Sequence, residues 1–197
     1  NLLKRIITST LLILLLILMN NSNKIMLISL IIISIISWVE FNKLFSKFLK
    51  KDKNKIYFLN IISFLYLSFF VLLIQNIEES QKVYFFYAII ISISTDIGGY
   101  VFGKTFKGKK LTKISPNKTI SGSIGSFLLS FIFLSLVVFY LTKNFDLINI
   151  TVVSFVTSLS CQLGDLFFSF LKRKSFLKDS GNFLPGHGGI LDRIDSI

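Results

Sequence analysis

Long apolar segments alternate with short lysine-rich segments along the whole chain, and this alternation restricts the folds open to it. The third and fifth apolar segments approach the ~20 residues that a helix needs to cross the hydrocarbon of a bilayer. With 52% apolar residues and a mean hydropathy of +0.71, a soluble domain would lack polar surface. We therefore predict an all-α, polytopic integral membrane helical bundle. Its six expected spans lie at roughly 6–19, 25–39, 56–74, 83–102, 122–141 and 148–163.

The basic residues indicate which loops face the cytoplasm. With the N-terminus inside, 19 of the 22 Lys and Arg residues fall on one side, at positions 4 and 5 and in 40–55, 103–121 and 172–197. Cytoplasmic loops of membrane proteins carry such an excess. We therefore expect a multi-pass protein of the inner (plasma) membrane whose N-terminus and active site are cytoplasmic. Because topology explains the net charge of +12, we predict no nucleic-acid partner.

The chain is interpreted as a single transmembrane domain, residues 1–197. Residues 1–82 supply the N-terminal spans, and within them 41–55 alternates Lys with aromatic residues and Leu, which favours an interfacial helix on anionic lipid. Residues 83–197 form the catalytic part with cytoplasmic motifs. Since the chain begins with Asn and stops directly after a polar motif, we expect both ends to be cut from a longer protein, with a further C-terminal helix missing.

Uncommon residue types concentrate in two regions, 98–125 and 181–193, which hold both prolines, the only His and most of the glycines. Carboxylates and basic residues accompany the second region, namely Asp165, Asp192 and Asp195, and Lys172, Arg173 and Lys178. This combination fits a hard-cation site with phosphates between the metal and the basic side chains. Taken singly, these residues also fit a solvated juxtamembrane segment, with Arg193 as a local partner of the Asp pair.

A glycine-rich loop, Pro185-Gly186-His187-Gly188-Gly189, precedes the helix predicted to carry the Asp pair on one face. Its backbone amides are expected to approach an anion closely at the helix N-terminus. In the upstream region, Asp96 lies within or at the edge of a span, where an ionisable group is costly and points to function, although a boundary Asp remains an alternative. The upstream candidates for binding phosphate oxygens are Ser115, Lys118 and Thr119.

These motifs resemble the signature of the phosphatidate cytidylyltransferases, also called CDP-diacylglycerol synthases. The resemblance covers about 27 residues: Ser169-Phe-Leu-Lys172-Arg173, Lys178-Asp179, Pro185-Gly-His187-Gly-Gly and Asp192-Arg193-Ile-Asp195. Upstream, Asp96, Gly99-Tyr100, Gly103-Lys104 and Ser115-Pro116 through Lys118-Thr119 to Gly122 are similar to a second motif of that family.

The resemblance implies a magnesium-dependent nucleotidyltransferase of phospholipid biosynthesis that joins CTP and phosphatidate into CDP-diacylglycerol and diphosphate. It assigns metal binding to Asp165, Asp192 and Asp195, with a second cation and a homodimer as options. Catalysis would involve Asp165, Lys172, Arg173, Asp192 and His187. Substrate binding would involve Asp96, Ser115, Lys118, Thr119, Lys178 and Arg193. For His187 we favour hydrogen bonds to phosphate or to the loop over general acid–base work, because the attacking phosphate is already ionised near neutral pH.

The chain departs from the family pattern at two places. Phe168 stands where the family usually has Glu before the Ser, and Ile120-Ser121 stand where an aromatic residue and Glu or Gln usually follow Lys-Thr. Losing both acids would tune metal affinity or reduce activity, but the three Asp and the basic set are intact, so we expect an active enzyme. The alternatives are another CTP-dependent lipid enzyme, such as a CDP-archaeol-type synthase or a polyprenol kinase, and a transporter or non-catalytic membrane protein.

Overall fold

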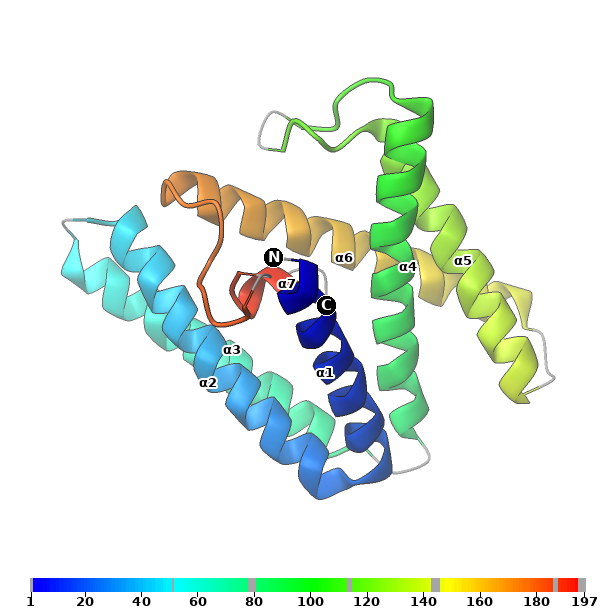
Figure 1. The fold of residues 1–197 in the computed structure, drawn as a ribbon, viewed down its shortest axis with the longest axis horizontal. Coiled ribbons are helices and arrows are strands. Elements are labelled where there is room, and N and C mark those ends of the chain that lie inside the picture. The colour runs from blue at the N-terminus through cyan, green and yellow to red at the C-terminus, as the bar shows by residue number, and fades with distance from the viewer. Residues whose placement is uncertain are drawn as a thin grey trace. The chain divides into compact units, whose positions relative to one another are not determined.

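The computed structural model describes residues 2–50, 52–77, 81–112, 115–142, 146–185 and 188–194. Within these ranges the chain forms helices and two isolated β-bridges but no β-strand (Figure 1). The helices are α1 (Leu2–Asn21), α2 (Asn23–Phe48), α3 (Lys53–Gln75), α4 (Lys82–Phe106), α5 (Ile120–Thr142), α6 (Leu147–Lys174) and α7 (Leu191–Ile194). They belong to two compact units, Asn1–Ile77 with Leu171–Ile194, and Glu78–Phe170 with Asp195–Ile197.

The predicted all-α membrane architecture is confirmed. Each of the six predicted segments lies in one of the helices α1 to α6, and all six are long and apolar enough to cross a membrane. The helices run past the predicted spans, most clearly α2, which continues to Phe48, and α6, which continues to Lys174. Lys, Ser and Phe are all compatible with a helix, so the appearance of charge marks the end of the apolar part and not the end of the helix.

The segment 41–55 does not form a separate helix. Its first part, up to Phe48, supplies the last turns of α2, and α3 begins at Lys53. The side chain of Asp52 caps α3 by accepting a hydrogen bond from the Lys55 N–H at 3.2 Å. Contact of this segment with the membrane surface stays a prediction.

In the first unit, α2 and α3 pack side by side (Figure 1). The Trp38 indole N–H donates to the carbonyl oxygen of Asn60 at 3.1 Å, and the Asn60 side-chain amide donates to the Asn42 side-chain oxygen at 3.0 Å. The Trp38 ring also meets Phe64 edge to face. Polar side chains thus join the two apolar helices near their charged ends, where such bonds specify register.

In the second unit, α4 and α5 lie side by side and their backbones touch at glycines (Figure 1). A Cβ atom added at Gly98 would overlap the Gly125 carbonyl group, and one at Gly122 would lie 2.7 Å from the Gly99 carbonyl oxygen. Small residues permit this approach, which replaces lipid contact by close van der Waals packing. Nearer the beginning of α4 and the end of α5, the core is apolar and includes Tyr87, Ile91, Leu134 and, from α6, Ile150.

Buried hydroxyl groups connect the helices of the second unit. The Thr95 hydroxyl of α4 donates to the Ser158 hydroxyl of α6 at 3.0 Å, and the Ser126 hydroxyl of α5 donates to the Thr95 carbonyl oxygen at 2.7 Å. All three side chains are almost fully buried. Since an unpaired hydroxyl in an apolar interior is costly, these bonds favour one arrangement of α4, α5 and α6.

We expect Gly125→Val to destabilise the protein by about 1–3 kcal/mol, because the new side chain would collide with Phe102 and force α4 and α5 apart. The measurement is thermal unfolding of the detergent-solubilised full-length protein. The control is Leu128→Val, an exposed position on the same helix. Equal unfolding temperatures for the two variants would contradict the close contact.

Candidate functional site

A polar cavity of about 320 Å³ lies in the second unit, among α4, α5, α6 and the loop before α5. Its lining contains two carboxylates, one ammonium group and several hydroxyl groups. It is lined by Thr95, Asp96, Gly99, Tyr100, Leu111, Ser115, Asn117, Lys118, Thr119, Gly122, Ser123, Ser126, Gln162, Asp165 and Ser169. The structure thus brings together five of the predicted site residues, Asp96, Ser115, Lys118, Thr119 and Asp165.

An ion pair joins the loop to α6 at this cavity. The Lys118 ammonium group contacts the Asp165 carboxylate, and the two side chains are 27% and 29% exposed. Asp165 follows the predicted span 148–163 and lies inside α6, which continues to Lys174. A rigid helix therefore presents the carboxylate, and the ion pair fixes the position of the loop lysine.

The loop that carries Lys118 is shaped by its own hydrogen bonds. The Leu111 N–H donates to the Lys118 carbonyl oxygen at 2.8 Å, and the Ile120 N–H donates to the Lys109 carbonyl oxygen at 3.0 Å. The Thr119 hydroxyl accepts from the Gly122 N–H at 3.1 Å, which satisfies an amide in the first turn of α5 as an N-cap does. Thr119, predicted to bind phosphate, therefore also has a structural task.

The first unit holds a second ion pair. The Lys172 ammonium group donates to Asp192 Oδ1 at 2.9 Å, and the side chains are 16% and 7% exposed. Asp192 Oδ2 accepts from the backbone N–H groups of Ser180 at 2.8 Å and Gly189 at 3.0 Å. Burial acts to raise the pKa of Asp192, but the bonds from Lys172, Gly189 and Ser180 outweigh burial and hold this pKa below its usual value. The carboxylate is therefore ionised and fixed in position.

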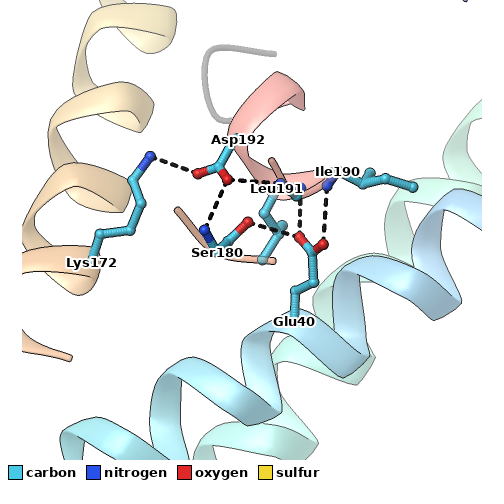
Figure 2. A network of polar contacts seen from close by, with 7 residues as sticks. Glu40, Lys172, Ser180, Ile190, Leu191 and Asp192 are labelled. Carbon is cyan, nitrogen blue, oxygen red and sulfur yellow. Dashed lines mark hydrogen bonds and ion pairs between the residues drawn. The ribbon is translucent and has the colours of Figure 1, made fainter. Parts of the chain in front are cut away.

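Beside this ion pair lies a carboxylate that sequence reasoning missed, Glu40 of α2, which is only 5% exposed. Figure 2 shows it beneath the segment that leads into α7. Glu40 Oε2 accepts from the Ser180 hydroxyl at 2.8 Å and the Leu191 N–H at 2.9 Å, and Oε1 accepts from the Ile190 N–H at 3.1 Å. The available signal was that Glu40 is the first acidic residue of the chain and follows a long apolar segment.

The backbone amides of 189–191 bond carboxylates of the protein itself, and binding of a phosphate by the glycine-rich loop stays a prediction. The amides are bonded to the carboxylates of Asp192 and Glu40. The glycines make room for this arrangement, since a Cβ atom at Gly181 or Gly189 would overlap Glu40. The helix that follows is the single turn α7, which contains Asp192.

The remaining predicted residues are placed as follows. Arg173, Lys178 and Arg193 are exposed in the first unit. His187 and Asp195 lie outside the described residues. Within the described ranges no group of three or more His, Cys, Asp and Glu side chains is gathered to hold a metal ion. The predicted set of three Asp includes Asp195, which is outside these ranges, so metal binding by that set stays a prediction.

Comparison with known proteins assigns the chain to a family. Residues 2–197 match the model of the cytidylyltransferase family. The phosphatidate cytidylyltransferase of Bacillus subtilis (strain 168) is 41% identical over 124 residues, which is 62% of this chain and 46% of the relative. The protein of the same name from Staphylococcus haemolyticus (strain JCSC1435) is 45% identical over 114 residues, 57% of this chain and 44% of the relative.

A third phosphatidate cytidylyltransferase, from Rickettsia typhi (strain ATCC VR-144 / Wilmington), is 40% identical over 135 residues, 64% of this chain and 59% of the relative. The chain spans about half the length of these relatives, between 44% and 59%. The family match covers nearly every residue, including both ion pairs. This chain belongs to the cytidylyltransferase family.

Proposed function

We propose that the protein containing this chain is a phosphatidate cytidylyltransferase, which transfers CMP from CTP to phosphatidate and yields CDP-diacylglycerol and diphosphate. The observation that carries the proposal is the polar cavity of the second unit, where Lys118 and Asp165 pair among hydroxyl groups. Membership of the cytidylyltransferase family and the names of the three relatives support the choice of reaction.

In this reaction a phosphate oxygen of phosphatidate attacks the α-phosphorus of CTP. The new P–O bond replaces the bond to the oxygen that bridges the α- and β-phosphates, and diphosphate leaves with that electron pair. The attacking phosphate is already ionised near neutral pH, so the reaction needs no strong general base. The protein must mainly hold two polyanions together and neutralise the charge that develops between them.

Two lysines are best suited to bind phosphate oxygens, Lys118 and Lys172. Each is held by a carboxylate, Asp165 or Asp192, which fixes the ammonium group in one place. A positioned cation stabilises a developing negative charge without reorganisation. Further phosphate contacts are proposed for Ser115, Thr119, Arg173, Lys178 and Arg193.

The cavity also suits Mg²⁺, because its donors are oxygen atoms. Asp96 and Asp165 supply carboxylates, while Gln162 and Ser169 supply an amide oxygen and a hydroxyl. Mg²⁺ prefers oxygen ligands and is commonly held by one or two carboxylates together with substrate phosphates. We propose that Asp165 and Asp96 hold the ion, which when bound would neutralise phosphate charge; participation of Asp192 and Asp195 stays a prediction.

The protein is a multi-pass membrane protein, and we further propose that it lies in the inner membrane with its N-terminus and polar loops in the cytoplasm. The support is the charge distribution, in which 19 of the 22 basic residues fall on one side of six alternating spans. This orientation would place the Lys118 loop and the segment after α6 on the side where CTP is found.

Asp165→Asn should lower the conversion of labelled CTP and phosphatidate by about 100-fold or more, because a neutral amide no longer pairs with Lys118 and binds a cation weakly. The matched control is Asp146→Asn, since Asp146 precedes α6 and an Asn there can still accept from the Asn149 N–H. Both variants are assayed as full-length protein.

Similar turnover in the two Asp variants would contradict the role of Asp165. A wild-type protein that turns over no CTP with any phospholipid acceptor would reject the enzyme itself. Turnover only with a polyprenol or an archaeal-type ether lipid would select a different CTP-dependent lipid enzyme.

Lys118→Ala should raise the KM for CTP by about tenfold, because a phosphate oxygen loses a charge-assisted hydrogen bond. Lys109→Ala is the control, since Lys109 is exposed in the same loop. Steady-state kinetics at varied CTP concentration measure the effect. If both substitutions change KM equally, Lys118 contributes only general positive charge.

The orientation predicts opposite labelling of two introduced cysteines. They are placed in a Cys161→Ser background, because Cys161 is the single cysteine of this sequence. Cysteine at Gln81 should react with a membrane-impermeant maleimide in intact cells. Cysteine at Lys109 should react only after the membrane is permeabilised. The reverse pattern would invert the proposed topology.

A further inference from the structure

Glu40 is a buried carboxylate that none of the proposed chemical steps uses. It lies on α2, far in sequence from the C-terminal segment. The three hydrogen bonds that it accepts from described residues nevertheless all come from that segment, from Ser180, Ile190 and Leu191. Its side chain is 5% exposed. Burying a charged group is costly unless hydrogen bonds compensate it, so a carboxylate placed here needs these donors.

Ser180 links Glu40 to Asp192. The Ser180 hydroxyl donates to Glu40 Oε2, and the Ser180 N–H donates to Asp192 Oδ2, both at 2.8 Å. Three consecutive backbone amides link the same two carboxylates a second time. The Gly189 N–H donates to Asp192, and the Ile190 and Leu191 N–H groups donate to Glu40. The two carboxylates therefore share one short stretch of backbone, as Figure 2 shows.

From this network we propose that Glu40 is a positioning residue for catalysis. It fixes the backbone at Ser180 and at 189–191, and that backbone in turn aims Asp192 at Lys172. The inference rests on the proposed cytidylyltransferase function, in which Lys172 binds phosphate. Small displacements of a positioned group can lower a rate strongly, so rigid support of this ion pair matters.

The site requires a carboxylate with this length of side chain. Among the residues that the structure describes, Glu40 accepts three hydrogen bonds, from one hydroxyl and two backbone N–H groups. In Glu40→Gln one oxygen becomes an NH₂ group, which would face at least one backbone N–H and leave a buried donor without an acceptor. In Glu40→Asp the carboxylate is one methylene shorter and cannot reach all three donors without movement of α2 or the loop.

A second contact keeps α2 and this segment together, which allows the role of Glu40 to be tested apart from folding. The Ser175 hydroxyl donates to the Leu44 carbonyl oxygen at 2.9 Å, one turn further along α2. Both Leu44 and Ser175 are fully or almost fully buried. Because this anchor does not involve Glu40, Glu40→Gln should loosen the loop while α2 and the end of α6 stay joined.

The test uses full-length protein in detergent and compares Glu40→Gln with Asp52→Asn, a control at an exposed carboxylate whose capping bond an Asn can keep. Hydrogen exchange is measured by mass spectrometry, and kcat and KM are measured per folded molecule. We expect amides of peptides covering 180–191 to exchange at least about tenfold faster in Glu40→Gln, with α4 and α5 unchanged. We expect kcat to fall by about tenfold or more while the KM for phosphatidate changes less than twofold.

The inference is overturned if the amides of 180–191 exchange in Glu40→Gln at the same rate as in the wild-type protein. It is also overturned if they exchange faster while kcat is unchanged. If Glu40→Gln is too unstable to purify, Ser180→Ala removes only the hydroxyl bond to Glu40 and should show the same two effects more weakly. Failure of the proposed function is recognised separately, because the wild-type protein would then lack CTP turnover while the exchange difference would still be measured.

Discussion

The hydrocarbon core of a membrane contains no water, and this constraint governs how the chain is built. Every backbone N–H and C=O group there must find its partner within the protein, which leaves helices as the available structure for apolar segments of this length. Within the described residues the helices α1 to α6 satisfy this requirement. Irregular backbone, with amides free to take other partners, occurs in the loop before α5 and in the segment between α6 and α7.

Both irregular segments are fixed in the same way, by an ion pair between a lysine and a carboxylate from separate parts of the chain. In one unit the loop supplies Lys118 and the helix α6 supplies Asp165. In the other unit the end of α6 supplies Lys172 and the turn α7 supplies Asp192. Removing one member of a partly buried pair leaves the other charge without compensation, so each pair holds its segment in one position.

The helices could be predicted from the sequence because, in a membrane protein, the apolar segments are also the segments that form helices. Asp165 and Lys118 could be chosen as candidates from the sequence, because Asp165 follows an apolar segment and Lys118 stands in the Ser115–Thr119 motif. Their pairing could not, because spacing along the chain does not reveal which loop folds back on which helix. The cap formed by Thr119 follows a recognisable signal, a Thr directly before an apolar helical segment.

The partners of Glu40 could not be predicted either, for a different reason. It follows a long apolar segment and belongs to no motif, while two of its three donors are backbone amides, which every sequence supplies. A sequence can show that a charge is out of place, but only the fold identifies its partners. The same holds for Gly189, whose amide bonds the carboxylate of Asp192, a partner that the glycine-rich pattern alone does not reveal.

The glycine contact between α4 and α5 limits the routes into the cavity of the second unit. Where Gly98 and Gly125 bring the two backbones together, no space remains for an acyl chain to pass between the helices. The same two helices form walls of the cavity through Gly99, Gly122 and their neighbours. Within the second unit, the open sides of this cavity therefore lie beside α6 and the Lys118 loop, and not between α4 and α5.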